Sequence, residues 1–262
     1  MIDTHAHLDV AEFAADRDEV IARAEAAGVT AIVCPAVSAA SSQAVVELAG
    51  RYNQLYAAVG IQPTDAAAAV AGDWDRVVAL AGQPRVVAIG ETGLDRHWDD
   101  TPFDIQQDYF DRHLRLARQR DLPIIIHCRE AEADLLPMLR AAAVGGPLRG
   151  VLHSFSGDAD FARECLALGL DASFAGAVTY TNKKFEPLWA VAAMIPDDRI
   201  LVETDSPYLV PHPLRGKQKR NEPAQILLTA QRLADLRGQT LDELDRMTTA
   251  NGRRLFRIGA TL

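Results

Sequence analysis

The chain contains eight short apolar runs that alternate with stretches of helical pattern. The runs are nearly continuous in apolar and often β-branched residues, which is typical of parallel strands buried on both faces. They cover Met1–His7, Val29–Ala36, Leu55–Ile61, Val86–Glu91, Pro123–His127, Gly150–Ser154, Leu170–Ala175 and Ile200–Asp205. The pattern therefore predicts an α/β fold with eight parallel strands.

The segments between these runs predict helices. The first is expected from about Ala11 to Ala27, and Gly28 is suited to end it. Others are expected at Ile105–Gln119, Ala131–Ala142, Ala159–Ala167, Phe185–Ala193, Pro223–Leu236 and Leu241–Thr248. Thr240 and Glu243 have the spacing of a capping box at the start of the last one.

This alternation favours a (β/α)8 TIM barrel that covers residues 1–262 as one domain, because such barrels usually contain about 250 residues. A doubly wound open sheet is the alternative, and it would bind ligands near one switch point. Five of the apolar runs end in a histidine or a carboxylate. Side chains from five strand ends converge naturally only in a closed ring, so the barrel is preferred.

The polar residues at these strand ends resemble the ligand set of a two-metal hydrolytic site. His5 and His7 are two residues apart, so a strand would direct both toward the barrel mouth. The Glu91 carboxylate could bridge two metal ions held about 3.5–4 Å apart. The candidate ligands are His5, His7, Glu91, His127, His153 and Asp205. A single one of these histidines would more simply be a core residue, but the set predicts a metallohydrolase.

Asp205 and Glu91 are the candidate catalytic residues. A carboxylate such as Asp205 can both bind a metal and accept the proton of a water molecule. Glu203 lies on the same strand face, where it is either an outer partner of the ligands or a buried, ion-paired carboxylate. Histidine and carboxylate ligands suit two divalent ions, and Zn²⁺, Mg²⁺ or Mn²⁺ would be accepted.

The net charge of -9 argues against binding to nucleic acids or membranes through overall charge, so phosphate recognition would need local cations. Arg129 lies two residues beyond His127 and could contact a phosphate through both guanidinium nitrogens. The segment after the eighth run contains Arg215, Lys217, Lys219 and Arg220. Lys183 and Lys184 could also contact a phosphate, but a solvated helix start explains them as simply. The aromatic residues Phe155, Tyr180 and Tyr208 follow strand ends and would either stack on bases or pack beneath loops.

The chain resembles the TatD-type metal-dependent deoxyribonucleases, a branch of the amidohydrolase-like barrels. The matching segments follow the family order over almost the whole chain: 3–9 (DTHAHLD), 90–95 (GETGLD), 127–129 (HCR), 153–157 (HSFSG), 203–207 (ETDSP) and 220–223 (RNEP). The resemblance implies a barrel that hydrolyses phosphodiester bonds in DNA. It further implies one metal on His5, His7, Glu91 and Asp205, and a second on Glu91, His127 and His153.

One segment departs from the family pattern. The family commonly has a histidine-rich stretch after the third strand, whereas this chain has Gln62 in the sequence Gly60-Ile61-Gln62-Pro63. The glutamine amide can hydrogen-bond a phosphate oxygen or water, so Gln62 is a candidate substrate contact. It cannot act as an acid, a base or a cation.

Three alternatives remain from the residues alone. A barrel hydrolase of esters or amides, including esters carried on nucleic acids, would use the same metals. A binding protein that retains metals for structure is disfavoured, because such a site needs no proton acceptor like Asp205. The third is an RNA substrate. No motif that recognises a 2′-hydroxyl is evident, so the residues alone do not separate RNA from DNA.

The remaining features predict a cytoplasmic enzyme. The cysteines are odd in number and lack CxxC spacing, which is typical of a reducing compartment. Asp3, His5 and Asp9 interrupt the apolar core that a signal peptide would need. We expect single-stranded DNA or DNA ends as the partner, no membrane association, and a plausible monomer.

Overall fold

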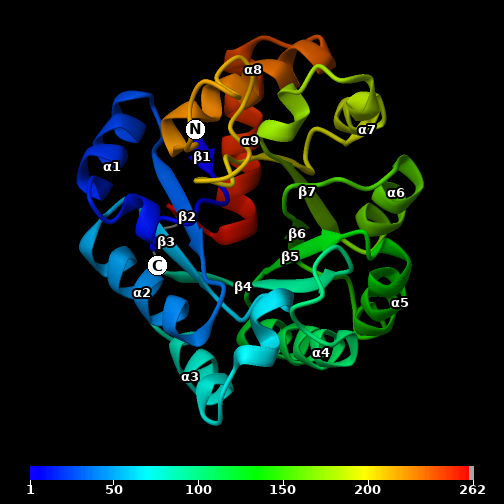
Figure 1. Cartoon of the computed structure of the whole chain (residues 1–262). Coiled ribbons are helices and arrows are strands. Elements are labelled where there is room, and N and C mark those ends of the chain that lie inside the picture. The colour runs from blue at the N-terminus through cyan, green and yellow to red at the C-terminus, as the bar shows by residue number, and fades with distance from the viewer. Residues whose placement is uncertain (260–262) are drawn as a thin grey trace.

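The computed structural model describes residues 1–259, and its centre is a nearly closed barrel of eight parallel strands in chain order. The strands are β1 Ile2–Asp3, β2 Ala31–Pro35, β3 Leu55–Val59, β4 Val86–Asp95, β5 Ile124–Arg129, β6 Gly150–Leu152, β7 Leu170–Phe174 and β8 Ile200–Val202. Backbone hydrogen bonds from Thr4 N to the Val202 oxygen (3.3 Å) and from Asp205 N to the His5 oxygen (2.8 Å) join the last strand to the first. The predicted TIM barrel is therefore confirmed (Figure 1).

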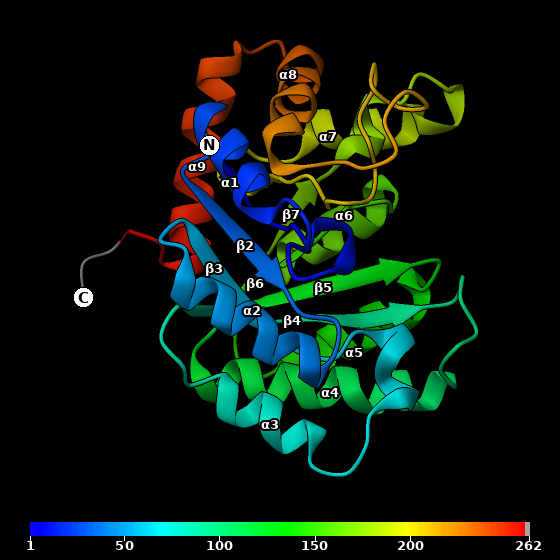
Figure 2. The same ribbon diagram turned by 60° about the vertical axis from the view of Figure 1, so that its left-hand side comes forward.

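Helices surround this barrel, as Figures 1 and 2 show from two directions. The helices are α1 Arg17–Ala26, α2 Ala39–Arg51, α3 Asp73–Leu80, α4 Phe103–Arg120, α5 Glu132–Ala143, α6 Ala159–Ala167, α7 Glu186–Met194, α8 Ile226–Arg237 and α9 Leu241–Phe256. Short 3-10 turns occur at Ala11–Phe13, Pro63–Ala68, Gly176–Thr179, Lys183–Phe185 and Pro223–Gln225. Within residues 1–259, we find no helix with the length and apolar character that a membrane crossing requires.

Several predicted boundaries need correction. The first strand ends at Asp3 rather than His7, because the chain beyond it turns toward the segment after β8, where His7 N donates to the Ser206 oxygen. The fourth strand continues past Glu91 to Asp95 and pairs with β5 up to Arg129. The eighth strand likewise ends at Val202 rather than Asp205. The sequence therefore located every strand but misjudged how far several of them extend.

The helix predictions differ more from the structure. The expected first helix is divided into the 3-10 turn Ala11–Phe13 and α1. The last helix continues beyond Thr248 to Phe256, after a capping box at Thr240 that forms as expected. The sequence pattern indicated neither α2, whose stretch is rich in alanine and serine, nor α3, which is only eight residues long.

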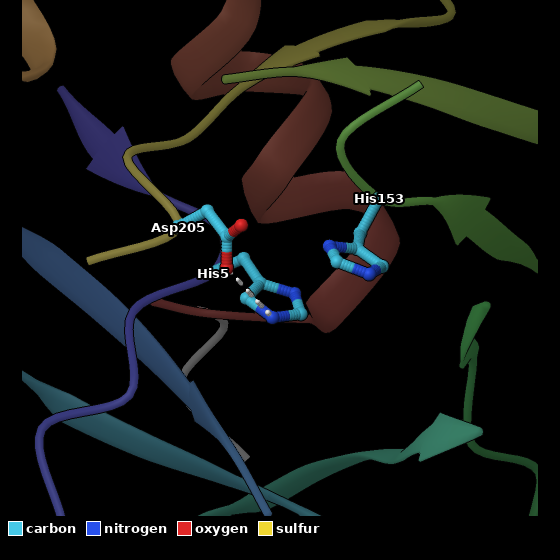
Figure 3. Close-up of side chains that lie close together, drawn as sticks. All are labelled: His5, His153 and Asp205. Carbon is cyan, nitrogen blue, oxygen red and sulfur yellow. Dashed lines mark ion pairs between the residues drawn. The ribbon is translucent and has the colours of Figure 1, made fainter. Parts of the chain in front are cut away.

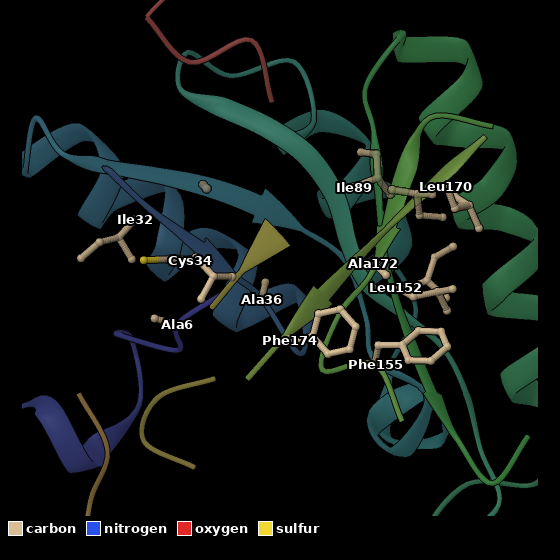
Figure 4. Packing of buried hydrophobic residues seen from close by; sticks show 14 of the residues in the cluster. Ala6, Ile32, Cys34, Ala36, Ile89, Leu152, Phe155, Leu170, Ala172 and Phe174 are labelled. Carbon is tan, nitrogen blue, oxygen red and sulfur yellow. The ribbon is translucent and has the colours of Figure 1, made fainter. Parts of the chain in front are cut away.

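Apolar side chains fill both the barrel interior and the layer between strands and helices. Inside the barrel, residues such as Val33, Ile125 and Leu201 pack together with Leu255 and Phe256 from α9. This α9 contribution closes the end of the barrel where the strands begin. The outer layer includes Leu152, Phe155 and Phe174, which Figure 4 shows side by side. Polar groups are consequently concentrated at the opposite end, beyond the carboxyl ends of the strands.

His113 on α4 is buried. Its Nδ1–H group donates to the Tyr109 carbonyl at 2.6 Å, and its Nε2 accepts from the Ile61 amide at 3.0 Å. These two bonds fix the neutral tautomer. Burial lowers the pKa of His113 to about 4. The imidazole thereby holds the end of the third strand, next to Gln62.

We expect His113 to destabilise the fold as the pH falls from about 6.5 to about 4. The pKa of His113 is about 4 in the folded protein and near 6.5 when unfolded, so the unfolded chain binds more protons within this window. Neutral His113 therefore makes its full contribution to the free energy of unfolding above pH 6.5. Up to about 3 kcal/mol of it is lost as the pH falls toward 4. Urea unfolding at several pH values would measure it. A His113→Gln variant that loses as much stability as the parent over this range would contradict the assignment.

Candidate metal centre

Glu91 reaches the centre of the barrel mouth through an irregularity in β4. Ile89 pairs with Ile124 but Thr92 pairs with Ile126, so β4 contains one extra residue at this point. Gly90 has a φ of 141°, and a Cβ atom built on it would lie 2.7 Å from the Ile125 carbonyl oxygen. Only glycine therefore fits at this position. The bulge directs the next side chain, Glu91, to the buried centre of the site, where it is 3% exposed.

The two oxygens of Glu91 face two separate histidine pairs. Oε2 lies 3.4 Å from His5 Nε2 and 3.6 Å from His7 Nε2. Oε1 lies 3.0 Å from His127 Nδ1 and 3.1 Å from His153 Nε2. Within each pair the nitrogens are close, at 3.1 Å for His5 and His7 and 3.2 Å for His127 and His153. The carboxylate thus stands between two groups of nitrogen donors.

Asp205 completes the cluster from the segment after β8. Its Oδ1 lies 3.7 Å from His5 Nε2 and 3.6 Å from His7 Nε2. Figure 3 shows Asp205 and His153 on either side of His5, whose ring stacks on that of His153 with centroids 4.0 Å apart. The structure therefore brings together all six candidate ligands that the sequence suggested.

Two further carboxylates orient the histidines from behind. His127 Nε2 contacts Asp95 Oδ2 at 2.8 Å, which leaves Nδ1 to face the cluster. His153 Nδ1 lies 3.5 Å from Glu203 Oε1, and this oxygen also accepts from the Ser154 amide at 2.6 Å. Such partners fix the tautomer and direction of a ligating imidazole. The sequence suggested this for Glu203 but not for Asp95, because the fourth strand was expected to end at Glu91 rather than Asp95.

The charges of the cluster depend on one another. Burial alone raises the pKa of Glu91, but His153 and His127 lower it more strongly, so the pKa is well below its usual value. For His153, burial lowers the pKa, whereas Glu91 and Glu203 raise it, and the result is well above the usual value. Protons on buried imidazoles therefore balance the buried carboxylates when no other cation is near.

These residues fit divalent metal ions. Two groups of donor atoms, each within 4.8 Å of one another, fall within the two expected sites: His5, His7 and Glu91 form one, without the Asp205 also expected there, and Glu91, His127 and His153 form the other. Imidazole nitrogens and carboxylate oxygens are suitable ligands for Zn²⁺ or Mn²⁺. A metal ion bound here would take the place of protons on the imidazoles, because a histidine that binds a metal must be neutral. A third group, His5, His153 and Asp205, lies across the two.

The candidate substrate contacts fall into two classes. Arg129 and Lys217 are exposed, and Arg215 is exposed with its guanidinium 3.8 Å above the Tyr180 ring. Arg220 instead donates to Asp16 Oδ1 and Oδ2 at 2.8 and 2.7 Å, so its guanidinium joins the barrel rim to the segment before α1.

The remaining candidates are partly or wholly engaged within the protein. Gln62 is half-buried, and its amide donates to Asp65. Of the aromatic candidates, Phe155 and Tyr180 are buried beneath loops, whereas Tyr208 is 53% exposed.

Comparisons with known proteins point in one direction. A family model described as TatD related DNase matches residues 2–257. The uncharacterized metal-dependent hydrolase YabD of Bacillus subtilis is 42% identical over 261 residues, which cover 98% of this chain and 99% of the relative. The 3'-5' ssDNA/RNA exonuclease TatD of Salmonella typhimurium is 36% identical over 260 residues, with 98% and 99% covered. The crystal structure of YJJV, a TatD homologue of Escherichia coli, superposes with a TM-score of 0.91 at 32% identity and covers 98% of each chain.

We expect Asp95→Asn to weaken metal binding at the His127 side of the cluster by about 10- to 100-fold, as loss of an outer partner typically does. In the variant, the amide nitrogen would either face His127 Nε2, which removes the acceptor for that ring nitrogen, or face the loop amides, which removes theirs. The His127 ring would therefore lose its fixed tautomer. Titration with Mn²⁺ or Zn²⁺, followed by calorimetry, would resolve the weakened site. Two unchanged affinities would show that Asp95 does not orient the ligand.

Proposed function

This chain belongs to the TatD-related DNase family of metal-dependent hydrolases, and from this we propose that it degrades single-stranded DNA from an end by hydrolysing phosphodiester bonds. The observation that carries the proposal is the placement of Glu91 between two histidine pairs with Asp205 beside it. The Salmonella typhimurium relative is named an exonuclease of single-stranded DNA and RNA, which supports the substrate class.

The residues of the cluster divide the chemistry among them. Divalent metals bound here would lower the pKa of water and offset charge on the phosphate. Asp205 lies at the open side of the cluster, where its carboxylate orients the attacking water and accepts its proton. Glu91 uses both oxygens and holds the two ligand groups at a fixed separation. The reaction then needs no nucleophile from the protein.

Exposed cations at the mouth would hold the polynucleotide backbone. We assign phosphate contacts to Arg129, which is exposed at the end of β5, and to Arg215 and Lys217, which are exposed on the segment that follows β8. We give Arg220 the role of joining the rim to Asp16, since its nitrogens are committed to that contact. Gln62 remains a candidate contact, because its amide has a second N–H besides the one donated to Asp65.

The decisive prediction concerns Asp205. We expect end-labelled single-stranded DNA to shorten with the parent protein and Mg²⁺ or Mn²⁺, and the Asp205→Asn variant to be slower by about 10²–10⁴-fold, the usual contribution of a positioned base. The length distribution of the products on a denaturing gel would measure the rate and the end from which degradation begins.

The matched control is Asp75→Asn, which makes the same chemical change at an exposed aspartate on α3. Its rate should equal that of the parent. Full activity in Asp205→Asn would refute the assigned role. An inert parent that still binds metal would refute the nuclease proposal and direct the search to esters, including those carried on nucleic acids.

We further expect His127→Ala to lose the metal on its side of the cluster while the His5–His7 side retains its own. The reason is that Glu91 Oε1 would keep only His153 as a neighbouring imidazole. Elemental analysis after gel filtration would report about one metal per chain fewer than in the parent. His97→Ala is the control, since His97 pairs with the exposed Glu130 outside the cluster. An unchanged metal content in His127→Ala would contradict the ligand assignment.

A further inference from the structure

Trp98 is an exposed aromatic side chain on the loop that joins β4 to α4. It is 52% exposed, whereas Trp74 and Trp189 pack against the hydrophobic core. A single exposed aromatic residue is not unusual by itself. The position of Trp98 is unusual because its loop is attached directly to the metal centre.

The attachment runs through one carboxylate. Asp95 Oδ1 accepts from the amides of His97 and Trp98 at 2.8 and 2.9 Å, while its Oδ2 contacts His127 Nε2 at 2.8 Å. Asp95 is itself buried and 2% exposed. The backbone of Trp98 and the ring of a candidate ligand are therefore held by the same group, so the loop that carries the indole has a defined position relative to the cluster.

The surroundings of the indole suit a nucleotide. The His97 ring meets the indole edge-on at 4.8 Å, with an angle of 89° between the planes. The guanidinium of Arg129 lies over one face of the indole, 5.7 Å from its centroid. The indole is 52% exposed, so a base can stack on the face away from Arg129 while a phosphate pairs with the guanidinium.

A second aromatic side chain flanks the other half of the cluster. Tyr208 is 53% exposed, its ring lies 5.9 Å from that of His7, and its amide donates to the Asp205 carbonyl at 2.8 Å. Trp98 is thus connected to the His127 side and Tyr208 to the His7 side. A strand whose scissile phosphate lies at the cluster would extend bases in both directions.

We propose that Trp98 is the stacking platform for a base on the His127 side of the scissile phosphate, in a single-stranded nucleic acid substrate. The proposal rests on the proposed nuclease function and adds a specific subsite to it. Stacking needs an unpaired base with an accessible face, so this subsite selects single strands over duplexes and tolerates every base.

The test measures binding in an Asp205→Asn background with Mg²⁺, so that the probe is not cleaved. The probe is a labelled oligothymidylate, and its anisotropy reports the affinity. We expect Trp98→Ala to weaken binding by about 5- to 150-fold, and Trp98→Phe to restore most of the loss because phenylalanine also stacks. Val144→Ser is the control, because Val144 is 88% exposed on the connection between α5 and β6, at the end of the barrel where the strands begin.

A set of probes with one abasic nucleotide at successive positions locates the contact. At one position, the abasic nucleotide should reduce the affinity of the Trp98 protein by the full stacking effect and leave the affinity of the Trp98→Ala protein unchanged. A loop that had merely loosened would not produce this pattern. Equal affinity of Trp98→Ala and Trp98 proteins for the intact probe would overturn the subsite. If the parent cuts the strand while that equality holds, only the subsite is wrong. If no single-stranded DNA or RNA is bound or cut, the nuclease function fails as well.

Discussion

The burial of one carboxylate, Glu91, is the constraint on which the rest of the site depends. A charged group that is 3% exposed is unfavourable unless cations and hydrogen-bond donors surround it. Here four imidazoles from three separate segments converge on its two oxygens. Only a closed ring of parallel strands brings those segments to one point, so the chemistry of Glu91 and the barrel topology require each other.

The two ends of the barrel solve different problems. At one end α9 inserts Leu255 and Phe256 beneath the interior residues of the strands, and its Arg254 pairs with the buried Asp171 of β7. That packing supports strands whose other ends carry buried charge. The outer carboxylate Asp95 then restricts the ring of His127, and Glu203 lies behind the ring of His153. Stability and function are therefore separated along the barrel axis, as is general for this fold.

The sequence was sufficient for the strands and the ligand types, because continuous apolar runs and polar strand ends are local signals. It was insufficient where the outcome depends on a partner distant in the chain. Residues 4–7 leave the strand because they bond to the segment after β8, and His113 is buried because its acceptor nitrogen meets the Ile61 amide. Asp95 was missed as an orienting group for the same reason, since its role depends on the register between β4 and β5.

The chain must attract a polyanion although its net charge is -9. Part of the basic segment after β8 is committed internally, since Arg220 binds Asp16. The cations assigned to phosphate contacts, Arg129, Arg215 and Lys217, are few, so the affinity for a strand cannot come mainly from counterion release. Metals at the Glu91 cluster and exposed aromatic faces act only over short distances and need a strand with accessible bases. Such a surface favours an unpaired end threaded into the mouth over a duplex lying across it.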